Sequence, residues 1–335
     1  MVQLSILDII PVPEGSTPGD ALRRAANLAV AAEGWGYNRY WIAEHHNMVG
    51  AAGAATAVNV CHIAGATRRI RVGAGGIMLP NHPPLIVAEQ FGTLESLYPG
   101  RIDLGLGRAP GTDHMTARAM RRNTGRAQEF PFEVQELQGY FQPDDGAARV
   151  RAIPGTGLRV PLWILGSSPS SGALAGAMGL PYAFASHFAP DGLMEGLATY
   201  RSSFAPSEVL SAPYVMLGVN VILADTQREA ERMFTSIQQR YLNIVRGTPG
   251  KLPAPVDDIN SLWTASEARQ VSHMLHYSFV GTVESVGPQL SRFIDQTAAD
   301  ELIVSATLYD AAARLRSYEL LAKLGQAGPV SQAYA

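Results

Sequence analysis

Short, β-branched apolar runs alternate along the chain with helical patterns. The apolar runs predict eight strands, at residues 3–10, 39–43, 70–79, 101–107, 161–165, 182–186, 214–223 and 301–306. Periodicity and capping residues predict helices at residues 17–32, 54–66, 83–97, 126–141, 170–178, 191–204 and 310–324, and one more that begins at 226. Strands without polar alternation are typical of parallel sheets buried on both faces. Eight strand–helix units therefore predict an α/β fold of the (β/α)8 TIM-barrel type.

Two long connections interrupt this alternation. Residues 108–160 follow the fourth strand, and residues 244–299 lie between the seventh helix and the eighth strand. The chain has 335 residues, whereas a barrel of this type needs about 250. We expect one barrel domain over residues 1–325, with the surplus in these two insertions, where it shapes the substrate pocket. Residues 326–335 are expected to form a C-terminal tail.

Composition and charge narrow the functional class. The chain has 26 Lys and Arg against 29 Asp and Glu, a net charge of -3, which does not favour binding to nucleic acid or to acidic membranes. Its single cysteine, Cys61, excludes an internal disulfide and a thiolate metal site. No apolar stretch reaches the ~18 residues that span a bilayer, and residues 1–10 lack the features of a secretory signal. We expect a cytoplasmic protein.

The chemistry of such a barrel lies at the C-terminal ends of its strands. The second strand runs directly into Glu44, His45 and His46, where a histidine can act as general acid or base near neutral pH. The alternative is a pair of loop histidines that form only local hydrogen bonds. A metal site is disfavoured, because adjacent side chains point apart and the other six histidines supply no clear further ligands.

The third and fourth strands are rich in glycine near the same end of the barrel. Gly73, Gly75 and Gly76 lie inside the third strand, where missing side chains allow a flat group to approach the backbone. A bulge or tight barrel packing would explain them equally well. The end of the fourth strand resembles a dinucleotide-binding loop, but its third glycine comes one position late and Pro110 takes its place. A Rossmann site is therefore not supported.

Two further strand ends offer groups that suit an anion. Arg108 follows the fourth strand and could bind a phosphate or carboxylate, unless it is a solvated surface arginine. The fifth strand ends before a helix with four serines, 167, 168, 170 and 171, where hydroxyl and backbone N–H groups can bind an anion. Helix capping alone would need only one of them. Together with the histidine and the glycine strand, these groups predict a pocket for a phosphorylated planar cofactor.

The sequence resembles the bacterial luciferase-like family of flavin-dependent monooxygenases, and within it the oxidoreductases that emit no light. The resemblance covers most of the chain to about Gly325 and is carried by RYWIAEHHN at 39–47, GAGGIMLPNH at 73–82, EQFGTL at 89–94, GRIDLGLGR at 100–108 and LGSS at 165–168. It implies a (β/α)8 barrel that binds FMN at its C-terminal face. It also implies that reduced FMN reacts with O2 to form a C4a-peroxyflavin, which oxygenates a small organic substrate.

The resemblance assigns roles to particular residues. His45 matches the catalytic histidine. Gly75 and Gly76 match a dipeptide with a non-proline cis peptide bond, against which the flavin ring lies. Arg108, Ser168 and Ser171 match the residues that bind the FMN phosphate, and Ser167 lies beside them. The resemblance implies no metal ion. The luciferase cysteine before the arginine is Gly107 here, and the acidic residue of the fifth strand is Ser167, so light emission is not supported.

The resemblance also implies partners. Reduced FMN would come from a separate flavin reductase, because the chain carries no nicotinamide-binding fingerprint. Family members often dimerise through early helices, and the apolar helices at 54–66 and 83–97 are compatible with a homodimer. Two alternatives remain open, a hydride-transferring oxidoreductase that uses the deazaflavin F420 and a non-catalytic flavin-binding protein. A hydrolase is disfavoured by the lack of a recognisable nucleophile or carboxylate pair.

Overall fold

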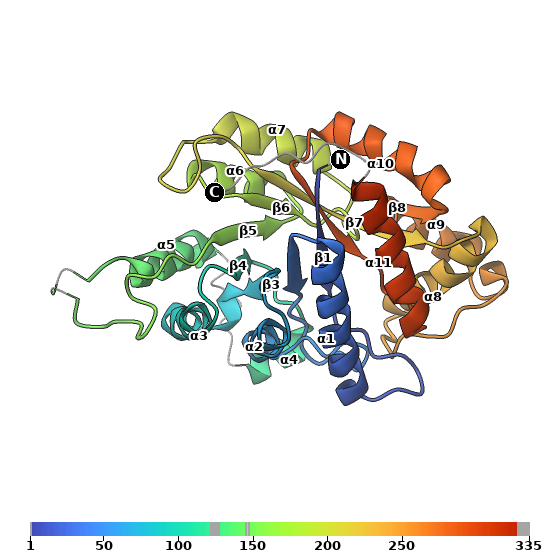
Figure 1. Cartoon of the computed structure of the whole chain (residues 1–335), viewed down its shortest axis with the longest axis horizontal. Coiled ribbons are helices and arrows are strands. Elements are labelled where there is room, and N and C mark those ends of the chain that lie inside the picture. Colours follow the sequence, from blue (N-terminus) through green and yellow to red (C-terminus); the bar gives the residue numbers. More distant parts are fainter. Residues whose placement is uncertain (1, 121–127, 145, 147, 327–335) are drawn as a thin grey trace.

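The computed structural model describes residues 2–120, 128–144, 146 and 148–326. Within these ranges, nine parallel strands form one sheet, and eight of them close into a barrel surrounded by helices (Figure 1). The order around the barrel is β1-β2-β3-β4-β5-β6-β7-β9, and β9 pairs again with β1. The predicted (β/α)8 TIM barrel is confirmed.

The elements follow the predicted alternation closely. The strands are β1 (Gln3–Asp8), β2 (Arg39–Ile42), β3 (Arg71–Met78), β4 (Ile102–Gly107), β5 (Leu162–Gly166), β6 (Tyr182–Phe184), β7 (Val215–Leu223), β8 (Ser278–Gly281) and β9 (Glu301–Ser305). The helices are α1 (Pro18–Trp35), α2 (Thr56–Ala66), α3 (Pro84–Leu97), α4 (His114–Ala119), α5 (Phe130–Phe141), α6 (Pro169–Ala177), α7 (Leu193–Ser203), α8 (Gln227–Val245), α9 (Ala265–Met274), α10 (Val283–Thr297) and α11 (Ala311–Gln326), with short 3-10 turns η1 (Leu79–Asn81) and η3 (Ile259–Ser261). No helix in the described ranges has both the length and the apolar character needed to cross a membrane.

The first helix shows how local sequence sets these bounds. Thr17 caps α1 by accepting a hydrogen bond from the backbone N–H of Asp20 at 3.2 Å, and Pro18 occupies the first helical position. The helix ends at Gly36, whose φ of 85° is the left-handed conformation that glycine adopts most readily.

The two predicted insertions differ in content. The first holds α4 and α5; residues 126 and 127 of its predicted helix lie outside the described residues, as do residues 327–335 of the predicted tail. The second contains β8, which the sequence pattern did not predict because four residues between two helices give too short an apolar run. β8 pairs with Asn220–Leu223 of β7, just beyond the part of β7 that pairs with β9.

A polar network closes the N-terminal end of the barrel. Arg39, the first residue of β2, forms ion pairs with Asp103 of β4 at 2.8 Å and with Glu301 of β9 at 3.1 Å. Above this network the indole rings of Trp41 and Trp163 pack edge to face, with centroids 5.1 Å apart. Trp41 also donates its Nε1–H to Asp103. The barrel interior is therefore filled at this end, which leaves the opposite, C-terminal end for a cavity.

Candidate active site

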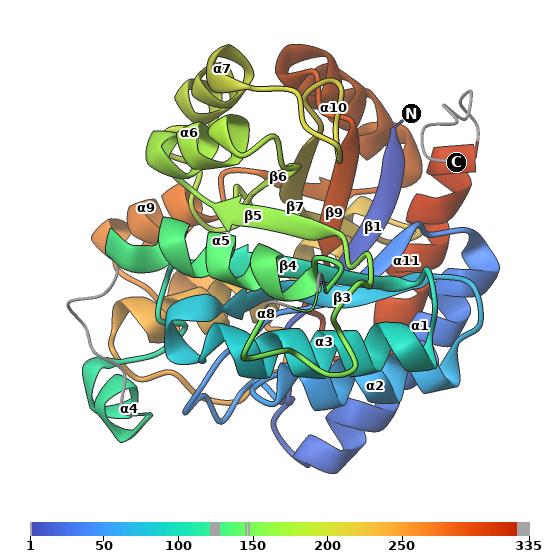
Figure 2. The same cartoon turned by 90° about the vertical axis from the view of Figure 1, so that its left-hand side faces the viewer.

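A cavity of about 740 Å³ lies at the C-terminal ends of the barrel strands. Each of the eight barrel strands contributes at least one lining residue, and α5, α6 and α8 supply others. Figure 2 shows this end as the side toward which the arrow of β5 points, where α4 and α9 lie. Its floor is the indole of Trp41 with the side chains of Leu7 and Ile303. Most of the lining is apolar, so a bound molecule would be shielded from water.

All seven residues predicted for the site line this one cavity. They come from four strand ends that are distant in the sequence, namely His45 after β2, Gly75 and Gly76 in β3, Arg108 after β4, and Ser167, Ser168 and Ser171 between β5 and the first turn of α6. The structure thus brings the predicted residues together.

The glycine pair of β3 has an unusual backbone. The peptide bond between Gly75 and Gly76 is cis, and the pairing of β3 with β4 shifts register between Ala74 and Ile77. A Cβ on Gly75 would lie 2.8 Å from Leu7 Cδ1, and one on Gly76 would lie 2.6 Å from the carbonyl oxygen of Gly105. Neither position has room for a side chain. Tight packing inside the barrel therefore accounts for both glycines, and both also line the cavity.

The serines after β5 form a compact hydrogen-bonded turn. Ser171 Oγ donates to the carbonyl oxygen of Ser168 at 2.7 Å and lies 2.9 Å from Tyr182 Oη. Ser168 Oγ lies 2.9 Å from Ser170 Oγ. This turn caps α6, whose positive N-terminal end therefore borders the cavity. Exposed Arg108, at the end of the neighbouring strand β4, adds a positive charge to the same side.

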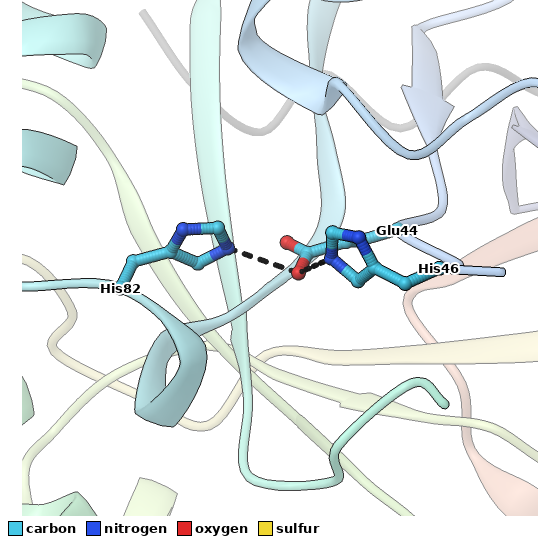
Figure 3. Close-up of side chains that lie close together, drawn as sticks. All are labelled: Glu44, His46 and His82. Carbon is cyan, nitrogen blue, oxygen red and sulfur yellow. Dashed lines mark hydrogen bonds and ion pairs between the residues drawn. The ribbon is translucent and has the colours of Figure 1, made fainter. Parts of the chain in front are cut away.

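A buried carboxylate positions the loop that carries His45. Figure 3 shows the Glu44 side chain between two histidines, with Glu44 Oε1 2.7 Å from His46 Nε2 and 2.9 Å from His82 Nε2. Glu44 Oε2 accepts a hydrogen bond from the backbone N–H of Met78 at 3.0 Å. Burial would raise the pKa of Glu44, but the hydrogen bonds from His82, His46 and Met78 lower it below its usual value. Glu44 thus ties the end of β2 to the end of β3.

The same three side chains are the one group in the described ranges with three potential metal-ligand atoms close together. An ionised carboxylate only accepts hydrogen bonds, so both histidines donate from Nε2 to Glu44. These hydrogen bonds account for the arrangement without an ion.

Three titratable lining residues were not predicted to belong to the site: His187, Arg240 and Tyr241. His187 lies beyond the end of β6, and its ring packs on Gly218 of β7, where a Cβ would come within 2.3 Å of His187 Nδ1. Arg240 and Tyr241 lie on α8. The sequence did hold a signal for the α8 residues, because Ile237, Arg240, Tyr241 and Ile244 follow the i, i+3, i+4, i+7 spacing of one helix face, and all four line the cavity.

Both cavity histidines are neutral at physiological pH. Burial, with the charge of Arg240 as a further cause, lowers the pKa of His45 to about 4. Burial, His45 and Arg240 together lower the pKa of His187 to about 3. The Nδ1 atom of each imidazole is buried and has no hydrogen-bond partner among the residues described. Both imidazoles line the cavity, although neither Nδ1 atom is exposed to it.

These lowered pKa values predict a loss of stability in acid. Between pH 6.5 and pH 4 the unfolded chain takes up protons at both histidines that the folded chain does not, so stability falls as the pH falls. We expect His187→Asn to reduce the drop in unfolding free energy between pH 7 and pH 4.5 by about 2 kcal/mol. Urea denaturation of the cofactor-free protein at both pH values measures this. His62→Asn, at an exposed position on α2, is the control, and an equal drop in the wild type and the His187 variant would contradict the prediction.

Comparisons with known proteins agree with this architecture. The sequence pattern of the family described as luciferase-like monooxygenase matches residues 2–319. A luciferase-like monooxygenase of Escherichia coli strain K12 is 48% identical over 320 residues, covering 95% of this chain and 96% of the relative. The N-acetyl-S-alkylcysteine monooxygenase of Bacillus subtilis strain 168 is 31% identical over 327 residues, covering 96% of this chain and 97% of the relative.

A solved structure extends the agreement to the fold. The crystal structure of apo-MsnO8 matches with a TM-score of 0.86 and 34% identity, over 98% of this chain and 100% of the other. The family pattern, the two named relatives and this structure each cover nearly the whole chain. The chain therefore belongs to the luciferase-like monooxygenase family and is a flavin-dependent monooxygenase.

Proposed function

We propose that the enzyme uses reduced FMN and O2 to oxygenate a small organic substrate, and that a separate reductase supplies the reduced FMN. The observation that carries the proposal is the meeting of His45, the Gly75–Gly76 backbone and the positively charged end of α6 in a single cavity. The homodimer and the cytoplasmic location expected above stay predictions from the sequence.

The residues of the cavity fit FMN. The molecule has a flat ring system at one end and a phosphate at the other. Gly75 and Gly76 present backbone without side chains, which suits contact with a flat ring. The turn formed by Ser167, Ser168 and Ser171, together with Arg108, suits a phosphate, because hydroxyl groups, a helix N-terminus and a guanidinium all favour an anion. The apolar walls exclude water from the space between these two ends.

Bound reduced FMN supplies the oxygen chemistry: it activates O2, one oxygen atom enters the substrate and the other leaves as water. The chain provides binding and proton transfer. We assign His45 as the residue that takes and returns the proton, because its imidazole lines the cavity and is neutral at physiological pH. Glu44 helps keep His45 in place, because Glu44 binds the side chain of His46 and is itself bound by the backbone N–H of Met78.

The substrate is proposed to be small, because the cavity must hold it together with the flavin. The B. subtilis relative is named for action on N-acetyl-S-alkylcysteines. Compounds of that type, with a thioether sulfur that can accept one oxygen atom, are the substrates with which we would begin.

The test is a single-turnover reaction. The protein with one equivalent of photoreduced FMN is mixed with buffer that contains ¹⁸O₂ and N-acetyl-S-methylcysteine. We expect a sulfoxide with one ¹⁸O atom, one water and one oxidised FMN per turnover. We also expect FMN to reoxidise more slowly than free reduced FMN.

Other outcomes of the single-turnover reaction would contradict the use of FMN or the type of substrate. Reoxidation at the rate of free FMN, with stoichiometric hydrogen peroxide, would contradict the proposal. Slow reoxidation without sulfoxide would contradict the substrate type but not the use of FMN. A parallel titration with F420 tests the hydride-transfer alternative, which would require binding of F420 in preference to FMN.

A further inference from the structure

Arg240 is a cavity cation that has no carboxylate partner among the residues described by the structure. It lies on α8, lines the cavity and is only partly exposed. In the described part of the chain its guanidinium contacts Met48 Sδ, 3.8 Å from its Nη2 atom, and the ring of Tyr241, whose centroid is 5.8 Å from the guanidinium carbon. By contrast, the buried guanidinium groups of Arg39 and Arg314 each pair with a buried carboxylate.

In the described ranges, the surroundings of Arg240 offer no acidic group. Among the described residues, no Asp or Glu lines the cavity, and its other titratable lining groups are Arg108, Tyr241 and the two neutral histidines. Burial lowers the pKa of Arg240, but a guanidinium stays charged at physiological pH. A charge removed from water is costly unless an opposite charge meets it. The missing partner is therefore expected to arrive with a ligand.

The position of Arg240 separates it from the proposed phosphate site. Arg108 and the serine turn follow β4 and β5, which are neighbours in the barrel. Arg240 lies on the helix that follows β7, and β6 stands between β5 and β7. If the phosphate of FMN occupies the serine turn, Arg240 therefore remains available to bind a second anion. Ile237, Ile244 and Met274 provide apolar surface on the same side.

We propose that Arg240 binds a carboxylate of the substrate, and that the substrate is an organic acid with an apolar body that packs on this face of α8. The inference rests on the proposed function in placing the FMN phosphate at the serine turn and in calling this ligand the substrate. The guanidinium would hold the carboxylate through paired N–H donors, and the apolar body would extend toward His45 and the glycine pair.

The test compares an acid with its neutral amide. Calorimetric titration of the protein loaded with oxidised FMN uses 3-phenylpropanoate and 3-phenylpropanamide, which have the same apolar body. We expect the wild type to bind the acid about 10- to 100-fold more tightly, which is the range for a charge-assisted hydrogen bond. Arg240→Gln should remove this preference, and Arg240→Lys should keep part of it.

Two matched controls define the role of Arg240. Arg232→Gln, on the same helix but in an exposed ion pair with Asp257, should keep the full preference. The ratio of FMN to riboflavin affinity should be unchanged in Arg240→Gln but reduced in Arg108→Ala. An unchanged ratio also shows that the Arg240 variant is folded; if that variant is not folded, Arg240→Lys provides the comparison.

The outcomes separate this inference from the proposed function. Equal affinity for acid and amide in the wild type, or failure to bind either at millimolar concentration, would overturn the inference. Retention of the preference in Arg240→Gln, or loss of the FMN preference in that variant, would also overturn it. No step of this titration uses O2 or reduced FMN, so failure of the oxygenation experiment leaves its result intact.

Discussion

His45→Ala is expected to lower the rate of substrate oxygenation by about 100-fold or more, while FMN binds with nearly wild-type affinity. General acid–base groups typically contribute factors of about 10² to 10⁴. The proposed phosphate site consists of other residues, which follow β4 and β5, so the variant should hold FMN as before. Reduced FMN in the variant should still react with O2, but it should release hydrogen peroxide in place of oxygenated product. The ratio of peroxide to product in single turnovers measures this effect.

The lowered pKa of His45 adds a second criterion. Because its pKa is about 4 in the cofactor-free protein, His45 stays neutral from pH 6 to pH 8 and its charge should not impose a pH dependence there. His62→Ala, at an exposed position away from the cavity, is the matched control and should oxygenate at the wild-type rate. Loss of FMN affinity in His45→Ala with a normal product ratio would show that His45 binds the cofactor and does not transfer protons.

The barrel was predictable from the sequence because its strands are buried on both faces. β7 shows this most clearly: all nine residues from Val215 to Leu223 are buried, so its sequence is apolar almost throughout and differs plainly from the amphipathic helix α8 that follows. β8 was missed for the opposite reason. It alternates buried and half-buried residues over only four positions, and it forms because the edge of β7 extends past β9.

The lining of the candidate site was predictable where polar residues directly follow a strand end. His45, Arg108 and the serines after β5 are of this kind, since a closed parallel barrel brings all such ends together. Arg240 lies three turns inside a helix, and its place at the cavity depends on how α8 packs. Likewise, nothing local in the sequence pairs Glu44 with His82, which are joined only when β2 lies beside β3.

Arg39→Met is expected to destabilise the protein by about 3–5 kcal/mol, the range for removing one partner of a buried ion pair. Arg39 is the cation between Asp103 and Glu301, and both carboxylates are fully buried. Burial alone would raise the pKa of Asp103, but Arg39 and Arg71 hold it below its usual value, so this carboxylate remains charged. The variant would leave Glu301 without an ion-pair partner among the described residues, while Asp103 keeps Arg71.

Urea denaturation at pH 7 measures the loss, and the exposed ion pair of Arg23 with Asp20 on α1 provides the control. Arg23→Met should leave the denaturation midpoint nearly unchanged, because an exposed pair contributes little. A loss below about 1 kcal/mol in Arg39→Met would show that the barrel end tolerates the unpaired charge.

The same network supports the active site, because Asp103 accepts the Nε1–H of Trp41, whose ring forms the cavity floor and lies under Gly75. Arg39→Met protein that remains folded should therefore also bind FMN more weakly, through a displaced Trp41, although Arg39 does not line the cavity.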